Sequence, residues 1–100
     1  MNNLINQVEQ WSIDKGLDKS NSFAQFTKTV EETGEVASGL ARGDKALIED
    51  GIGDVIVTLI ILAQQQGMSL EQCLQTAYNE ISGRTGEMID GVFVKSSDLK

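Results

Sequence analysis

The chain has 100 residues, of which 40% are hydrophobic and 23% charged, and its formal net charge is −7. That length suits a single domain covering residues 1–100. A chain this short buries only about 60–65% of the surface that its unfolded form exposes, which favours an oligomer. The negative charge argues against a nucleic-acid partner, because binding a phosphate backbone needs basic patches.

The reactive side chains are few. The sequence has no histidine and one cysteine, Cys73, which excludes histidine-based catalysis, an internal disulfide and a thiolate zinc site. Carboxylates remain for chemistry, and oxygen ligands suit Mg²⁺ or Mn²⁺. The N-terminus lacks the pattern of a signal peptide, and the longest apolar run, Val55–Ala63, is too short to span a bilayer. We therefore expect a cytoplasmic protein with no membrane partner.

Hydrophobic periodicity predicts a first helix over about Asn3–Lys15. A second helix, capped by one of residues 20–22, should run to Gly43. Its apolar face is formed by Phe23, Phe26, Val30, Ala37, Leu40 and Ala41. The aromatic residues Trp11, Phe23 and Phe26 lie on apolar stripes, which favours places in the core over stacking on a nucleobase.

Asp44 is a candidate N-cap for a third helix that continues to about Gln66. Within it, Val55–Ala63 is apolar on every side apart from Thr58, so it must be covered on every side. The remaining helices of so small a chain do not suffice for this. We therefore expect a second copy of the chain to cover the segment.

Ser69 and Gln72 form the capping box of a fourth helix, whose apolar stripe ends at Ile81. After Gly83 the pattern breaks up, and residues 92–94 (VFV) could be extended without making a sheet. The predicted fold is therefore all-α. It is a four-helix bundle completed by oligomerisation, with a short irregular C-terminal tail.

An acidic cluster lies on the second and third helices. Glu31, Glu32 and Glu35 fall toward one side of the second, and Asp50 and Asp54 share a side of the third. An antiparallel hairpin would bring the two groups face to face. Like charges at such spacing repel, and Lys28 is the one cation placed to offset them. A solvated acidic face would explain the spacing alone. Glycines inside both helices, at positions 34, 39, 51 and 53, favour a close approach of two backbones or a ligand, and thus a divalent cation.

The segments EETGEV and DGIGDVIVTLIIL resemble the MazG-like nucleoside triphosphate pyrophosphohydrolases, an all-α superfamily that includes dimeric dUTPases and dCTPases. The tail YNEISGRTGEMIDGVFVK is similar to that of small stand-alone, phage-like members. The resemblance implies a Mg²⁺-dependent enzyme that hydrolyses (deoxy)nucleoside triphosphates to the monophosphate and pyrophosphate in nucleotide-pool house-cleaning. It also implies a homo-oligomer, either a dimer or a dimer of dimers.

The first half of the family motif, E-E-x-x-E, is met here by Glu31, Glu32 and Glu35, and the end of its second half, E-x-x-D, by Gly53 and Asp54. The glutamate of that second half would fall on Gly51, and Asp50 is the natural substitute one turn before Asp54. The expected metal ligands are Glu32, Glu35, Asp54 and Asp50. Glu31 or Glu35 would be the catalytic base, a choice that the sequence leaves open. The expected substrate-binding residues are Lys28, Asn79, Arg84 and Lys95.

Two alternatives to an active enzyme remain at this level. One is a non-enzymatic helical interaction protein, like an antitoxin or adaptor, with an acidic face for a basic partner. The other is a metal-binding relative that has lost turnover because of Gly51.

Overall fold

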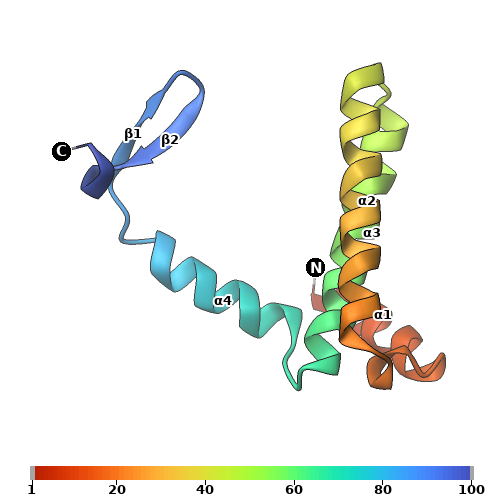
Figure 1. The fold of residues 1–100 in the computed structure, drawn as a ribbon. Helices are drawn as coiled ribbons and strands as arrows, with labels where there is room; N and C mark the ends of the chain where they lie inside the picture. Colours follow the sequence, from red (N-terminus) through yellow and green to blue (C-terminus); the bar gives the residue numbers. More distant parts are fainter. Residues whose placement is uncertain (1, 100) are drawn as a thin grey trace.

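The computed structural model describes residues 2–99, in which four helices precede a two-stranded β-hairpin (Figure 1). The helices are α1 (Asn2–Asp14), α2 (Ser22–Arg42), α3 (Lys45–Gln65) and α4 (Leu70–Ile81). The strands are β1 (Gly86–Ile89) and β2 (Val92–Lys95), and the 3₁₀ turns are η1 (Leu17–Lys19) and η2 (Ser96–Asp98). The prediction of an all-α fold with four helices is confirmed, and the helix bounds differ from the predicted ones by one or two residues. Among residues 2–99, no helix combines the length and apolar character needed to cross a bilayer.

Side-chain caps fix where three of these helices begin. Asn21, Asp44 and Ser69 precede α2, α3 and α4, and each accepts a hydrogen bond from the backbone N–H three residues further on, at 2.9, 3.1 and 3.1 Å. These bonds satisfy amide groups that have no partner within the helix. At the other end of α2, Gly43 adopts a left-handed conformation with φ of 64° and turns the chain into α3.

The C-terminal tail is not irregular, so that prediction was wrong. β1 and β2 pair antiparallel, with Ile89 opposite Val92 and Gly86 opposite Lys95. Asp90 and Gly91 form the two-residue turn between them, with φ values of 51° and 80°. Two consecutive positive φ angles characterise the turn whose twist matches that of paired strands, and Asp-Gly is among its preferred sequences. The Asp-Gly pair was therefore the signal for a hairpin.

α2 and α3 form an antiparallel hairpin, but α2 turns its small and polar side toward α3 rather than its apolar stripe. Gln25, Thr29 and Glu32 share the inward side of α2 with Val36 and Gly39. The apolar stripe faces outward instead. Its exposed fractions are 87% at Phe23, 57% at Phe26, 56% at Val30 and 65% at Leu40. Within the single chain, the expected core positions of Phe23, Phe26 and the half-exposed Trp11 (48%) are wrong.

The core lies along the C-terminal half of α3. Ile60, Ile61 and Ala63 are buried, and Ile5 of α1 is buried with them. The chain thus covers part of the Val55–Ala63 segment by itself, whereas Ile56 within that segment remains 42% exposed. The expectation that a second copy covers the segment therefore applies only to this exposed side of α3, and a single chain does not test it.

Three consecutive glutamines at the end of α3 hold the N-terminal part of the chain in place. Their side-chain amides donate hydrogen bonds to three separate segments: Gln64 to the Glu9 carbonyl at 3.1 Å, Gln65 to the Leu17 carbonyl at 2.9 Å, and Gln66 to Ser22 Oγ at 2.8 Å. α1, η1 and the first residue of α2 are therefore tied to one turn of α3.

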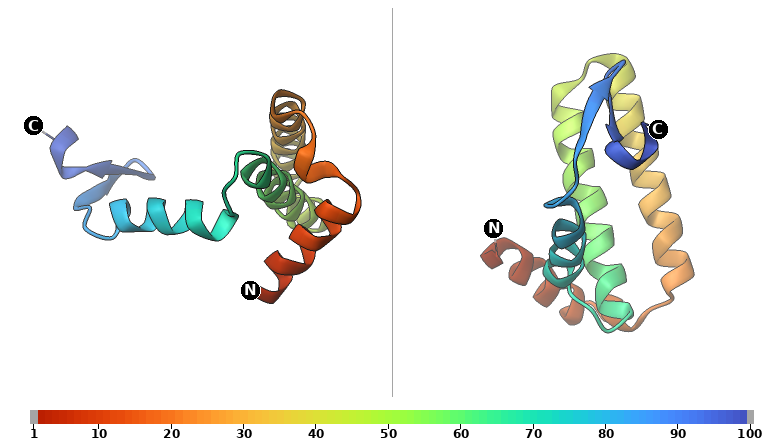
Figure 2. Two further views of the ribbon diagram at one scale, coloured as in Figure 1. Left: turned by 90° about the horizontal axis from the view of Figure 1, so that it is seen from below. Right: turned by 90° about the vertical axis from the view of Figure 1, so that its left-hand side faces the viewer.

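The C-terminal arm, which we define as residues 70–99, diverges from the α2–α3 hairpin (Figures 1 and 2). None of residues 70–99 is buried. The molecule is accordingly extended, measuring 49 × 34 × 27 Å, with a radius of gyration of 16.2 Å. A compact chain of 100 residues is expected to have a radius of gyration of about 13 Å.

Candidate metal centre

Three carboxylates meet between α2 and α3. Glu32 and Glu35 come from α2 and Asp54 from α3, and one oxygen from each lies within 4.8 Å of the other two. Glu32 and Asp54 are half-buried, whereas Glu35 is exposed. The three oxygens are close enough to share one cation, and a set of carboxylate oxygens suits a hard divalent ion.

The electrostatics of the cluster are unfavourable without a cation. A side-chain hydrogen bond with Glu35 raises the pKa of Glu32, and burial and the negative charges of Glu35 and Asp54 raise it further, against a lowering effect of Lys28. The pKa of Asp54 is also raised, first by burial and then by the charges of Asp50 and Glu35. Both carboxylates therefore ionise less readily than in water.

One oxygen of the cluster is buried without a hydrogen-bond partner among the described residues, which favours a bound cation over a solvated acidic face. Glu32 Oε2 is buried and finds no hydrogen-bond partner among residues 2–99. An acceptor removed from water without a partner is destabilising, and most buried polar atoms in proteins have one. A divalent cation between the three carboxylates would satisfy this oxygen. The residues present therefore fit a bound Mg²⁺ or Mn²⁺ ion.

Contacts between α2 and α3 flank the cluster on both sides, through two glycines on one side and two threonines on the other. On the side nearer the loop, a Cβ added to Gly51 would lie 2.9 Å from Val36 Cγ2 and 3.6 Å from the backbone of Val36. Further along, a Cβ at Gly39 would lie 3.0 Å from Ile48 Cγ1. On the other side of the cluster, Thr29 and Thr58 are hydrogen-bonded at 2.9 Å.

These contacts give a structural reason for glycine at position 51. Position 51 is buried against α2, so glycine there allows the close packing of the two helices. Gly39 serves the same purpose. An added Cβ at Gly34 or Gly53 would meet no described atom within 4 Å, so the prediction of a close approach holds for two of the four helical glycines.

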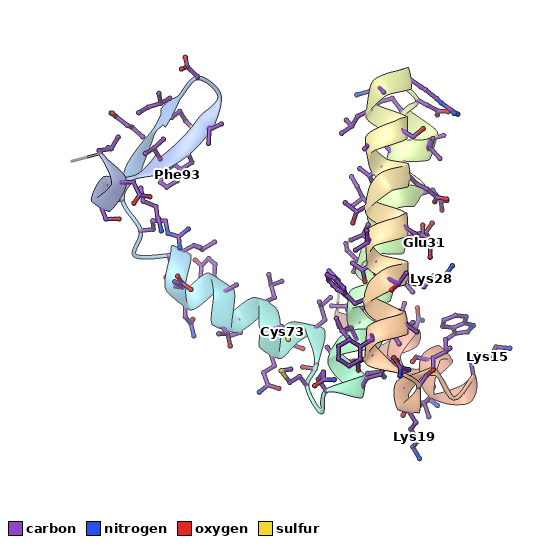
Figure 3. All side chains as sticks on the ribbon, viewed as in Figure 1. Lys15, Lys19, Lys28, Glu31, Cys73 and Phe93 are labelled. Atoms are coloured by element: carbon purple, nitrogen blue, oxygen red, sulfur yellow. The ribbon has the colours of Figure 1, made fainter. Side chains whose placement is uncertain are left out.

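Neither Asp50 nor Glu31 belongs to the group of three oxygens. Asp50 is exposed, and its charge acts on Asp54. Glu31 is exposed on α2 one turn from Lys28 (Figure 3). Asp50 thus remains a candidate ligand, and Glu31 remains a candidate base on the grounds of the sequence alone.

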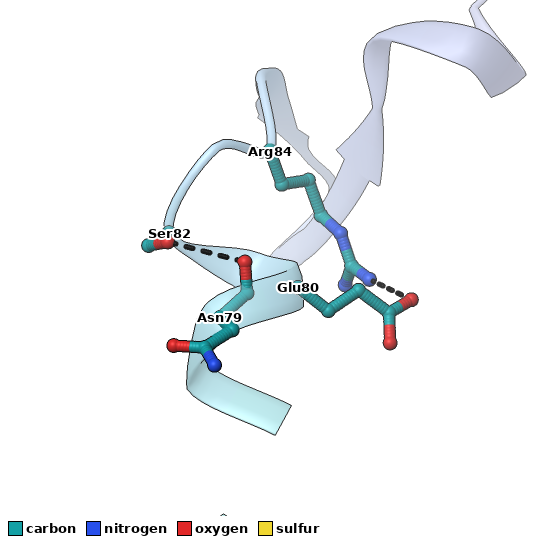
Figure 4. A network of polar contacts seen from close by, with 4 residues as sticks. All are labelled: Asn79, Glu80, Ser82 and Arg84. Atoms are coloured by element: carbon teal, nitrogen blue, oxygen red, sulfur yellow. Dashed lines mark hydrogen bonds and ion pairs between the residues drawn. The ribbon is translucent and has the colours of Figure 1, made fainter. Parts of the chain in front are cut away.

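The single chain does not bring the other expected substrate-binding residues to the cluster. Asn79, Arg84 and Lys95 belong to the C-terminal arm. Arg84 Nη2 pairs instead with Glu80 Oε1 at 3.2 Å (Figure 4). Asn79 accepts a hydrogen bond from Gln75 at 2.8 Å. An exposed ion pair of this kind stabilises little and leaves Arg84 available to a ligand.

A groove of about 830 Å³ adjoins the cluster, which the sequence did not reveal. Asp50 and Asp54 line it at the acidic end, and the apolar lining includes Leu4, Val8, Ile56 and Leu74. It has the size and the mostly apolar lining of sites for small ligands. Its walls come from α1, α3 and α4, which are separate segments of the chain, so no local sequence pattern predicts it.

The fold and the cluster define the class as an all-α protein with three converging carboxylates, whose oxygens suit a hard divalent cation. Residues 22–89 match the family model of the MazG nucleotide pyrophosphohydrolase domain, so the chain belongs to that family and the resemblance is confirmed.

The chain is also similar to an uncharacterised 18.2 kDa protein of the rep–hol intergenic region of Haemophilus phage HP1 (strain HP1c1). The two are 44% identical over 63 residues, which cover 62% of this chain and 39% of the phage protein. The match thus spans well under half the length of that relative. No solved structure matches the chain.

Proposed function

We propose that this protein is a cytoplasmic, metal-dependent nucleoside triphosphate pyrophosphohydrolase that removes surplus or non-standard (deoxy)nucleotides. The family match to a nucleotide pyrophosphohydrolase domain supports the reaction class. The observation that carries the proposal is the meeting of Glu32, Glu35 and Asp54, with Glu32 Oε2 buried and unpartnered. A solvated acidic face would leave all of these oxygens in water.

Each residue has a defined part in the proposed reaction. Glu32, Glu35 and Asp54 hold Mg²⁺ or Mn²⁺, with Asp50 at the edge of the site. A bound ion would supply positive charge for the phosphate oxygens and would lower the pKa of a water molecule at the site. Water attack at the α-phosphorus releases the nucleoside monophosphate and pyrophosphate. Glu35, or Glu31 beside it, accepts the proton of that water, since a carboxylate not fully engaged with metal can act as a base.

The groove beside Asp54 is the proposed place for the nucleoside. Its acidic end would lie next to the triphosphate and its apolar walls next to the base and sugar. Lys28, one turn from Glu32 on α2, would add positive charge at the phosphates.

We further propose that the functional form is a homo-oligomer, a dimer or a dimer of dimers. The single chain exposes 7325 Å². A compact monomer of 10.9 kDa is expected to expose about 5600 Å², so the excess is about 1700 Å² per chain. Obligate dimers bury about 2000–5000 Å² in total. The outward apolar stripe of α2 and the apolar side chains of the arm supply such a surface.

The oligomer would also complete the site. In that arrangement the arm of a second copy would bring its Asn79, Arg84 and Lys95 toward the phosphates. Sedimentation of the full chain at micromolar concentration tests this proposal. A folded monomer under those conditions would contradict it.

Pyrophosphate release from each dNTP, with Mg²⁺ and with chelator, tests the proposed reaction. We expect Mg²⁺-dependent release from the wild type and none from Glu35→Ala, with Glu71→Ala, an exposed acidic residue of the arm, as the matched control. Metal binding without release from any dNTP would instead favour a relative that has lost turnover. Neither binding nor release would leave the helical interaction protein as the better explanation.

A further inference from the structure

A hydrogen bond between two threonine side chains joins α2 to α3 next to the metal site. Thr29 Oγ1 donates to Thr58 Oγ1 at 2.9 Å, and the two residues are 8% and 7% exposed. Gln25 adds a second link, because its side-chain amide donates to the Thr58 carbonyl at 3.2 Å. We define the Thr29–Thr58 hydrogen bond as the threonine clasp.

The clasp lies within about one turn of the metal ligands on both helices. Thr29 precedes Glu32 by three residues, and Thr58 follows Asp54 by four. At 3.6 residues per turn, each threonine therefore lies on nearly the same side of its helix as the ligand it neighbours. The close contact of Gly51 with Val36 lies on the opposite side of the cluster. The ligands are thus held between a packing contact and a directed polar contact.

The direction of the clasp follows from its neighbours. Thr58 Oγ1 gives its one hydrogen to the Val55 carbonyl at 2.7 Å, so it can only accept from Thr29. Thr29 has a weaker alternative within its own helix, the Gln25 carbonyl at 3.3 Å. Both hydroxyls could therefore be satisfied without the partner helix. The hydroxyls do not need the bond between the helices for their own hydrogen bonding, so its main effect is to fix the position of one helix relative to the other.

From this arrangement we propose that Thr29 and Thr58 are positioning residues of the metal site. The clasp fixes the separation and rotation of α2 against α3 so that oxygens from both helices remain within reach of a single ion. Threonine suits this role because its branched side chain has few rotamers. The proposal rests on the proposed metal-dependent function, since it concerns the same carboxylates.

Mn²⁺ titration of the full chain, followed by electron paramagnetic resonance without substrate, tests the clasp. Thr29→Val and Thr58→Val keep the side-chain shape and remove one hydroxyl each. We expect each to weaken Mn²⁺ binding by about 10-fold, because a shift of one helix against the other would move the carboxylates apart, and displaced ligands bind a cation less tightly. The double variant should bind no more weakly than either single, because both changes remove the same bond. Thr29→Ser, which restores the hydroxyl, should recover most of the affinity.

Thr27→Val is the matched control. Thr27 lies on α2, is exposed, and donates to the Phe23 carbonyl at 3.1 Å within its own helix. Its substitution should leave Mn²⁺ affinity unchanged. Thermal melts establish a temperature at which every variant is folded, and the titrations are made there. If Thr58→Val does not fold, the comparison of Thr29→Val with Thr29→Ser decides.

The outcomes separate this inference from the proposed function. Normal Mn²⁺ binding by Thr29→Val would overturn the clasp and leave the metal site standing. Effects of the two substitutions that multiply in the double variant would also overturn it, because the threonines would then act independently. Failure of the wild type to bind Mn²⁺ would overturn the metal site and the clasp together.

Discussion

The α2–α3 hairpin and the C-terminal arm differ in how closely their residues pack. The hairpin places its two helices in close contact through Gly39, Gly51 and the threonine clasp, and it holds the three carboxylates. The arm contains no buried residue over residues 70–99, yet α4 has a clear apolar side that includes Leu74, Tyr78 and Ile81. The apolar side of α4 is therefore left uncovered by the described residues of the chain, as the proposed oligomer requires.

The largest expected difference between the two regions is in catalysis. Glu35→Ala should lower kcat by more than about 100-fold, since loss of even an outer-sphere partner of a metal ligand reduces activity by 10–100-fold. Arg84→Ala in the arm should raise KM by about 10-fold, which is the contribution of one charge-assisted hydrogen bond to a phosphate. Steady-state kinetics with one dNTP measures both. Equal losses of kcat in the two variants would remove the distinction between hairpin and arm.

Substitutions of Gly51 and Gly53 test whether the stability of the hairpin depends on close packing at position 51. Gly51→Ala should destabilise the protein by about 1–3 kcal/mol, because the added methyl overpacks the contact with Val36. Gly53→Ala should stabilise it by up to about 1 kcal/mol, because an added Cβ there meets no described atom within 4 Å and alanine favours helix. Urea unfolding of both variants provides the measurement. The same packing predicts that Gly51→Glu does not restore the family's ligand spacing.

The raised pKa values of Glu32 and Asp54 predict how the stability of the metal-free hairpin depends on pH. In the folded state both groups hold their protons to a higher pH than their ordinary pKa values of 4.5 and 3.8. Their contribution to stability is present below those values and is lost as pH rises through the folded pKa values.

Glu32→Gln in chelator should therefore melt at a higher temperature than the wild type at pH 7, with a smaller difference at pH 4. Mg²⁺ should raise the melting temperature of the wild type more than that of the variant. A variant that melts below the wild type at pH 7 in chelator would show that the cluster is not strained without metal.

The smallest expected effect concerns the edge of the site. Asp50→Asn removes a charge that raises the pKa of Asp54 but spares the three-oxygen cluster, so Mg²⁺ affinity should fall by less than about 10-fold. Glu49→Gln should change Mg²⁺ affinity less than Asp50→Asn, because Glu49 lines the groove but lies about 140° from Asp54 on an ideal helix. Calorimetric titration with Mg²⁺ compares the two. Loss of binding in Asp50→Asn would make Asp50 a ligand.

Local signals predicted the helices well, but the sequence analysis missed the β1–β2 hairpin and the side of α2 that faces α3. Caps at Asp44 and Ser69 and the stop at Gly43 act within one turn, so the sequence predicted the helix bounds closely. Helical spacing and an antiparallel hairpin predicted that the two acidic groups would face each other, and the family resemblance singled out Glu32, Glu35 and Asp54. The outward position of Phe23 could not be predicted, because the rule that apolar stripes face the core does not say which chain provides that core.

The glutamine contacts at the end of α3 have a consequence for how the chain acquires its fold. The bonds from Gln64, Gln65 and Gln66 join residues separated by 55, 48 and 44 positions. The α2–α3 hairpin closes through a short turn, whereas α1 can dock only after the last turn of α3 exists. Contacts of such long sequence separation form late, because loop closure must precede them. During synthesis, α1 therefore leaves the ribosome before α2 and α3 but reaches its final place after them.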